Sequence, residues 1–215
     1  KKFCPGPITF ILKKKKESQI DSLVSAKLDT VAIRFPSHKI IRSILKSIDF
    51  PLAMPSANIS SSISPVNAED VADEFKRNIN FILDGGKSKI GIESTVIDLT
   101  EKPTILRPGI ISPKIINNVL KIKKNIKKKS FRISSPGMLK RHYSPGIPVL
   151  LNQKTALGSN AFITIGKSHK SKKNYFNLSK KSDLKEAASN LYKTLRKIKK
   201  LKFKKIYVVK IPNIG

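Results

Sequence analysis

The stretch that decides the fold is residues 29–47, which read DTVAIRFPSHKIIRSILKS. Its first seven residues are a β-branched run that Pro36 closes, and this pattern predicts a strand over 29–35. Apolar side chains then recur at helical spacing over 38–47, and Ser37 is the expected N-cap of that helix. A strand that runs directly into a helix is the unit from which α/β folds are built.

The same alternation of strands and helices continues on both sides of this stretch. Further strands are predicted at 9–12, 81–83, 93–99, 104–107, 149–151, 161–165 and 206–211. Further helices are predicted at 67–76, 113–120 and 184–200. The sequence therefore predicts an α/β layer architecture.

The amino-acid composition of the chain changes after residue 112. Residues 121–137, KIKKNIKKKSFRISSPG, are rich first in Lys and then in Ser, Pro and Gly, which is typical of a linker. We therefore predict a domain at 1–120, a linker at 121–147 and a second domain at 148–215. The chain ends just after the last predicted strand, where an α/β unit would continue into a helix, so we expect the second domain to be cut short.

The charge is strongly basic and unevenly spread. The chain has 44 Lys and Arg against 14 Asp and Glu, a formal net charge of +30. Residues 1–112 hold 17 basic and 12 acidic residues, whereas residues 113–215 hold 27 basic and 2 acidic residues. A half of this kind can bind RNA, a membrane surface or an acidic partner. The alternative is a compositional bias towards Lys on solvated faces, since only seven of the basic residues are Arg.

Several classes of protein are excluded by composition. One Cys excludes an internal disulfide framework and a Cys-based zinc cluster, and three scattered His give no credible metal site. The apolar stretch at 3–12 is far shorter than the roughly 20 residues that cross a bilayer, and it lacks the features of a secretory signal. A soluble, cytoplasmic protein without a membrane partner is therefore expected.

Five segments combine small residues, prolines and single polar groups, as a backbone that approaches a ligand requires. They are FCPGPIT (3–9), TVAIRFP (30–36), PSAN (55–58) running on to Ser64, the set DGG, GIEST and RPG (84–86, 91–95, 107–109), and SPGM with KRHYSP (135–138, 140–145). In this order and spacing the first four resemble the YrdC-like family, the threonylcarbamoyl-AMP synthases. The fifth resembles the connector of the longer, two-domain branch of that family.

This resemblance implies a fold and an activity. The fold is a twisted open α/β sheet domain, followed by the linker and a small Rossmann-like α/β domain. The activity is the formation of threonylcarbamoyl-adenylate and pyrophosphate from L-threonine, bicarbonate and ATP, with Mg²⁺ arriving on the ATP. The product would pass to the machinery that transfers the threonylcarbamoyl group to tRNA, and contact with tRNA or double-stranded RNA is also implied.

The resemblance also assigns site residues, none of them a covalent catalyst or a metal ligand. The threonine-binding residues would be Arg34, Ser56 and Ser94. The ATP-binding residues would be Thr30, Asn58, Ser64, Arg107 and Tyr143. A lid over the pocket would contain Arg141, His142 and Tyr143.

The chemistry of these side chains agrees with the assignment. The planar guanidinium of Arg34 suits an amino-acid carboxylate, and that of Arg107 would neutralise phosphate charge. Ser56 and Asn58 offer neutral hydrogen-bonding groups for substrate oxygens. The structural alternatives are salt-bridged or surface arginines and an ordinary polar turn.

The chain departs from the family at its front, where relatives carry a pocket threonine and a Lys-x-Arg motif that grips ATP phosphates. We therefore expect the chain by itself to be inactive. One alternative is a basic RNA-binding module without catalysis, which predicts tight, steeply salt-dependent tRNA binding and little ATP binding. Another is the YrdC-like module of a hydrogenase-maturation carbamoyltransferase, which the single Cys and the linker type disfavour.

Overall fold

The computed structural model describes residues 2–120, 143–169 and 172–212. The chain divides into two compact units, one formed by residues 1–55 with 93–139 and the other by 56–92 with 140–214. The domain boundaries predicted at 1–120, 121–147 and 148–215 stay a prediction, because most of the predicted linker lies outside the described residues.

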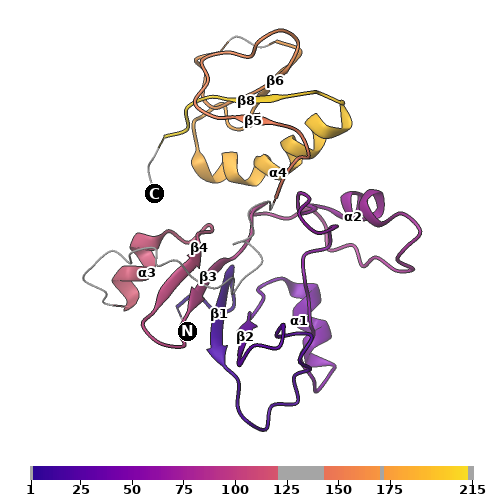
Figure 1. Cartoon of the computed structure of the whole chain (residues 1–215), viewed down its shortest axis with the longest axis vertical. Helices are drawn as coiled ribbons and strands as arrows, with labels where there is room; N and C mark the ends of the chain where they lie inside the picture. Colours follow the sequence, from indigo (N-terminus) through magenta and orange to yellow (C-terminus); the bar gives the residue numbers. More distant parts are fainter. Residues whose placement is uncertain (1, 121–142, 170–171, 213–215) are drawn as a thin grey trace. The chain divides into compact units, whose positions relative to one another are not determined.

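The first unit is built on a four-stranded mixed sheet in the order β2-β1-β3-β4. Its strands are β1 (Ile8–Lys13), β2 (Thr30–Ile33), β3 (Thr95–Asp98) and β4 (Thr104–Arg107). β1 runs parallel to β3, whereas the β1–β2 and β3–β4 pairs are antiparallel. Figure 1 shows helix α3 (Pro113–Leu120) beside this sheet. Ile8, Ile97 and Ile116 form a buried cluster that joins the helix to β1 and β3.

Helix α1 (Lys39–Lys46) follows β2, as the opening stretch of sequence predicts. Its N-cap, however, is His38, whose side chain makes no capping hydrogen bond, so the prediction of Ser37 as the cap was wrong. The backbone of His38 is already extended, and the helix begins one residue later than expected. Helix boundaries depend on backbone geometry that a cap-forming residue type does not determine alone.

The second unit contains a four-stranded sheet in the order β5-β8-β6-β7, and all its strand pairs are parallel. The strands are β5 (Val149–Leu150), β6 (Ala161–Thr164), β7 (Tyr175–Asn177) and β8 (Ile206–Val208). Helix α4 (Leu184–Lys200) lies along the sheet in Figure 1, and the unit also includes α2 (Ala68–Phe75). A parallel sheet covered by helices is the expected Rossmann-like arrangement.

The core of the second unit draws on both of its sequence segments. Ile63 and Val66 are buried together with Ile163, Ile198 and Ile206 in one apolar cluster. Asp183 caps α4 by accepting hydrogen bonds from two backbone amides of its first turn. Residues 56–92 therefore fold as part of the same body as the parallel sheet.

Most predicted elements are present, with two differences. Residues 81–83 were predicted to be a strand, which is wrong, because they form irregular chain in which Phe81 is 79% exposed. The short strand β7 was missed, since three residues between polar neighbours carry too little alternation to recognise. In the part of the chain that the structure describes, no helix is both long and apolar enough to span a bilayer.

Gly91 lies against the backbone of α4, so a side chain at this position should lower the stability of the protein. A Cβ at this position would be 2.4 Å from the carbonyl oxygen of Ser189, and the φ of Gly91 is +71°. Gly86 has a similar φ of +79° but open space around it, so it is the matched control. We expect Gly86→Ala to lower the free energy of unfolding by about 1–2 kcal/mol and Gly91→Ala to lower it by about 1–3 kcal/mol more, measured by urea denaturation. Equal losses in the two variants would contradict this close packing.

Candidate functional site

Three polar side chains of the first unit, those of Thr9, Ser94 and Arg107, meet at the N-terminal end of β3. Arg107, the last residue of β4, donates from Nε to the carbonyl oxygen of Ser94 at 2.9 Å and from Nη2 to its Oγ at 3.0 Å. The Oγ1 of Thr9 and the Oγ of Ser94 share a hydrogen bond of 2.7 Å. Neither contacting side chain is a general base at neutral pH, so Ser94 is suited to hydrogen bonding and not to nucleophilic attack.

The register of the sheet places these groups at one end of their strands. β1 aligns Ile8 with Thr95 in the parallel pair, and β4 aligns Arg107 with Val96 in the antiparallel pair. Just after β4, a Cβ at Gly109 would be only 2.6 Å from the backbone nitrogen of Thr95. The glycine therefore lets the chain after β4 pack directly on the segment that carries Ser94.

Arg34 lies just after β2 and keeps an exposed surface. Its Nε donates to the carbonyl oxygen of Gly6 at 3.3 Å. Partial burial lowers the pKa of the Arg34 guanidinium, the carboxylate of Glu93 opposes this shift, and Arg107 adds to it. Arg34 is therefore within electrostatic reach of both Glu93 and Arg107, and the effect of the Glu93 carboxylate is the larger of the two.

Thr30 does not belong to this group. It opens β2 and pairs with Lys13, whereas Arg34 follows the last residue of that strand. Four residues of extended chain separate the two by about 13 Å along the strand. The structure thus brings together Arg34, Ser94 and Arg107, but not Thr30, in the first unit.

The remaining predicted binding residues that the structure describes belong to the second unit. Asn58 and Ser64 lie on residues 58–64, which we call the 58–64 loop. The Oγ of Ser64 donates to the Oδ1 of Asn58 at 3.4 Å, and the Nδ2 of Asn58 donates to the carbonyl oxygens of Ile59 and Ser62 at 2.9 and 3.2 Å. Ser56 lies just before the loop, and its carbonyl oxygen accepts a hydrogen bond of 2.9 Å from the backbone nitrogen of Asn58. The asparagine therefore organises the loop that carries both predicted ATP contacts.

Tyr143 also lies close to this loop. Its ring stacks on that of Tyr192 in α4, with 5.7 Å between the ring centroids, and the next residue, Ser144, donates its backbone N–H to the carbonyl oxygen of Ser61 at 3.0 Å. The structure therefore brings Asn58, Ser64 and the chain at Tyr143 together. The other two predicted lid residues, Arg141 and His142, lie outside the described residues.

Glu74 of α2 holds the 58–64 loop through two hydrogen bonds. Its Oε1 accepts a hydrogen bond of 3.2 Å from the backbone nitrogen of Ile59 and another from the hydroxyl of Ser62. Burial tends to raise the pKa of Glu74, but the hydrogen bonds from Ser62 and Ile59, together with Arg196, hold it below its usual value. The ionised carboxylate is therefore the form that the folded loop favours.

This shift predicts a loss of stability in acid. A carboxylate whose pKa is lowered by folding stabilises the protein above its unfolded pKa, and the contribution disappears as the pH falls through the folded value. We expect the free energy of unfolding to fall between about pH 5 and pH 3, with a smaller fall in Glu74→Gln. Asp73, whose pKa Lys200 lowers, titrates in both proteins, so the difference between them isolates Glu74. Parallel pH profiles from urea unfolding would contradict the prediction.

Sequence reasoning missed three contributors to these groups: Thr9, Glu93 and Arg196. Thr9 and Glu93 stand inside quoted motifs, but nothing in their type separates them from ordinary strand and turn residues. Arg196 carried a usable signal, because it is the one arginine in a helix whose other basic residues are all lysines. An arginine kept in a lysine-rich chain favours a site that needs a planar set of donors.

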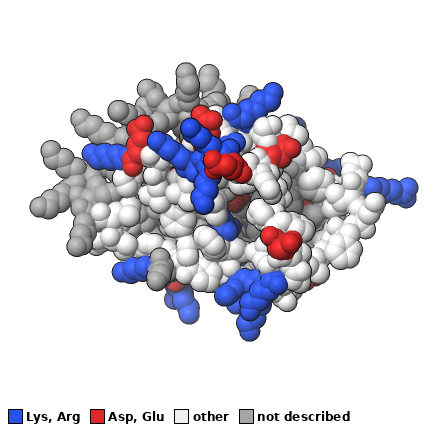
Figure 2. Space-filling view, turned by 90° about the horizontal axis from the view of Figure 1, so that it is seen from below, with Lys and Arg blue, Asp and Glu red and all other residues white. Residues whose placement is uncertain are grey.

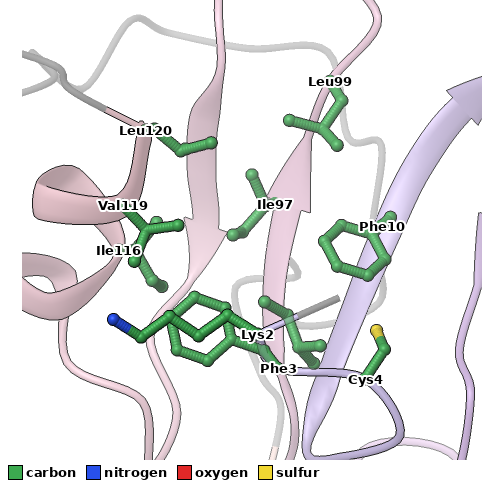
Figure 3. A pocket seen from close by; sticks show the side chains of 10 residues that line it. Lys2, Phe3, Cys4, Phe10, Ile97, Leu99, Ile116, Val119 and Leu120 are labelled. Carbon is green, nitrogen blue, oxygen red and sulfur yellow. The ribbon is translucent and has the colours of Figure 1, made fainter.

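Neither a metal centre nor an apolar binding pocket coincides with these groups. Among residues 2–120, 143–169 and 172–212, no cluster of three or more His, Cys, Asp or Glu could hold a metal ion. Figure 3 shows a cavity of about 150 Å³ in the first unit, lined by Phe3, Phe10, Ile97 and other mostly apolar side chains. It contains none of the predicted site residues and offers little to a charged substrate.

Several lysines of the second unit stabilise α4 or pair with acidic residues. Lys197, Lys199 and Lys200 occupy the last turn of α4, where positive charge complements the helix dipole, and Lys200 forms an ion pair of 2.5 Å with Asp73. On the face drawn in Figure 2, Lys and Arg are scattered and several stand beside Asp or Glu. RNA binding stays a prediction, and the Lys-rich residues 121–129 lie outside the described part of the chain.

Two family models together match nearly the whole chain. The model for Sua5, YciO and YrdC, described as telomere recombination, matches residues 1–109. The model described as threonylcarbamoyl-AMP synthase, C-terminal domain, matches residues 111–215.

Individual relatives agree with these matches. The threonylcarbamoyl-AMP synthase of Pyrococcus abyssi is 42% identical over 156 residues, which are 70% of this chain and 45% of the relative. That of Bacillus subtilis is 38% identical over 155 residues, 70% of this chain and 44% of the relative. The chain therefore spans less than half the length of these relatives. A crystal structure of P. abyssi Sua5 complexed with L-threonine matches with a TM-score of 0.83 and 32% identity, covering 100% of this chain and 68% of that one.

Proposed function

Because the chain belongs to the threonylcarbamoyl-AMP synthase family, with both its Sua5–YciO–YrdC and its C-terminal parts, we propose that it forms threonylcarbamoyl-adenylate and pyrophosphate. The substrates are L-threonine, bicarbonate and Mg·ATP, and the product serves the threonylcarbamoylation of tRNA. Mg²⁺ enters on the ATP phosphates as part of the substrate.

L-Threonine binds to the polar group of the first unit. The guanidinium of Arg34 holds the carboxylate, and the Ser94 hydroxyl, fixed by Thr9 and Arg107, contributes a hydrogen bond. Arg34 and Arg107 each offer a guanidinium group to an anionic substrate, and the carboxylate of Glu93 partly offsets the charge at Arg34.

ATP is held by the hydrogen-bonding side chains of the 58–64 loop. Asn58 and Ser64 offer an amide and a hydroxyl on a loop whose internal hydrogen bonds fix its shape. Arg107 faces the negative charge that develops as the adenylate forms. Tyr143, next to the residue that contacts Ser61, completes the set of nucleotide contacts in the second unit.

The chemistry takes place in two steps without a covalent enzyme intermediate. The amine of threonine adds to the carbon of bicarbonate, and loss of water gives a carbamate. A carbamate oxygen then attacks the α-phosphorus of ATP, the bond from this phosphorus to the oxygen bridging to the β-phosphate breaks, and pyrophosphate leaves. The protein contributes position and electrostatic stabilisation, which suits a site whose polar groups include no activated nucleophile.

The observation that carries the proposal is the geometry at Ser94, whose buried hydroxyl is contacted directly by Arg107 and Thr9. A buried hydroxyl held by a guanidinium group, with Arg34 hydrogen-bonded to Gly6 on the neighbouring segment, is chemically matched to an amino-acid carboxylate and a phosphate.

The test is pyrophosphate release from the chain with L-threonine, bicarbonate and Mg·ATP, with each substrate omitted in turn. Threonine-dependent release would support the proposal directly and would contradict the expectation that the chain alone is inactive. If there is no turnover, binding of both substrates by the same protein decides, and a chain that binds neither substrate contradicts the proposal.

A further inference from the structure

Arg196 of α4 is a buried cation that reaches outside its own helix. Only 9% of the residue is exposed. Its Nη1 donates to the carbonyl oxygen of Ile63 at 2.6 Å, and its Nη2 donates to that of Asp70 at 2.8 Å. Its Nε and Nη2 also form ion pairs with Asp70 at 3.2 Å and Glu74 at 3.0 Å. Two carboxylates and two carbonyl oxygens thus compensate for the burial of the charge.

These contacts reach the 58–64 loop along two routes. The direct route is the hydrogen bond to Ile63, next to Ser64. The indirect route passes through Glu74, whose Oε2 pairs with Arg196 while its Oε1 accepts from Ile59 and Ser62. Arg196 therefore supports the loop near its end, at Ile63, and near its start, at Ile59 through Glu74. Asn58 and Ser64 stand at these two ends.

Apolar packing secures only one side of the loop. Ile63 is buried in the core of the second unit, but Ile59 is 60% exposed. The early part of the loop therefore depends on Glu74, and the orientation of Glu74 depends on Arg196. A lysine carries its three donors on a single nitrogen, so it could not span the partners that Arg196 reaches from Nε, Nη1 and Nη2.

We propose that Arg196 is a positioning residue for nucleotide binding, which holds the 58–64 loop in the shape that presents Asn58 and Ser64 to ATP. The inference rests on the proposed function. It gives the region that matches the C-terminal family model a part in ATP affinity, because Arg196 lies in that region and the loop does not.

The test compares Arg196→Met with Lys200→Met in the whole chain. Lys200 is a matched control, because it also joins α4 to α2, through exposed ion pairs with Asp73 and Glu69, and does not touch the loop. Three quantities are measured under conditions where circular dichroism shows both variants to be folded. They are hydrogen exchange at the Ile59 amide and calorimetric affinity for Mg·ATP and for L-threonine.

We expect Arg196→Met to speed exchange at Ile59 and to weaken Mg·ATP binding about tenfold, the equivalent of one charge-assisted hydrogen bond. L-Threonine affinity should change much less, because the hydrogen bonds that hold Arg34 and Ser94 come from Gly6, Thr9 and Arg107 and not from the 58–64 loop. Lys200→Met should leave all three values near wild type. If Arg196→Met does not fold, Arg196→Lys, which keeps the buried charge but loses the fork, serves in its place.

The outcomes separate the inference from the function on which it rests. Unchanged Ile59 exchange or unchanged ATP affinity in the folded Arg196 variant would overturn the positioning role, and a lower melting temperature alone would not support it. A wild-type chain that fails to bind Mg·ATP would overturn the proposed function and the nucleotide role together. Faster Ile59 exchange in the variant would then show only that Arg196 orders the loop.

Discussion

Arg34→Ala is expected to weaken L-threonine binding by about 100-fold, the loss of a two-point contact between a guanidinium and a carboxylate. The side chain is already placed for this contact, because its Nε is held by Gly6 while its surface remains exposed. Affinity is measured by calorimetric titration of the whole chain. The folded state should be little affected, since the residue contributes no core packing.

Two variants sharpen this prediction. Arg34→Lys keeps the charge but not the fork, so it should recover only part of the affinity. Arg42→Ala removes an exposed arginine of α1 that lies outside the Ser94 group and should bind L-threonine like wild type. If Arg34→Ala retains wild-type affinity, the carboxylate is bound elsewhere and the assignment of Arg34 is wrong.

Arg107→Met is expected to weaken Mg·ATP binding by about 10- to 100-fold and to weaken L-threonine binding as well. The nucleotide loses a phosphate contact, and Ser94 loses two hydrogen bonds that hold its carbonyl oxygen and hydroxyl. The combined effect distinguishes Arg107 from Arg34, whose removal should affect L-threonine alone. Titration of each ligand into each variant measures both affinities.

Arg77→Met, at an exposed position after α2, is the control for the loss of one positive charge. Because the net charge of +30 attracts any anion, some loss of ATP affinity should appear in both variants at low salt. At about 0.15 M salt only the Arg107 variant should stay weak. Equal losses in both variants would mean that Arg107 acts through general charge and not through contact.

The fold followed from sequence wherever local pattern and tertiary packing agree. Thr104–Arg107, Pro113–Leu120 and Leu184–Lys200 have the predicted boundaries, because apolar periodicity and terminal residues there point to the same element. Residues 81–83 show the opposite case, since an apolar triplet predicts a strand only if a partner lies beside it. Pairing is a tertiary property that local sequence does not contain.

The candidate site was predictable only in part, and the reason is physical. Arg34, Ser94 and Arg107 belong to a recognisable motif order, and in the structure Arg107 contacts Ser94 while Arg34 is within electrostatic reach of Arg107. Thr9 joins them because β1 lies beside β3, which the motif order does not reveal. Arg196 supports the 58–64 loop from more than a hundred residues away, and such contacts come from packing alone.

A pair of calorimetric titrations of the whole chain, one with L-threonine and one with Mg·ATP, tests the Ser94 group most directly as a substrate site. We expect saturable binding of both ligands, loss of L-threonine binding in Arg34→Ala, and L-threonine affinity close to wild type in Arg42→Ala. Absence of binding for both ligands, or equal L-threonine affinity in the two variants, would show that the polar group at Ser94 is not a substrate site.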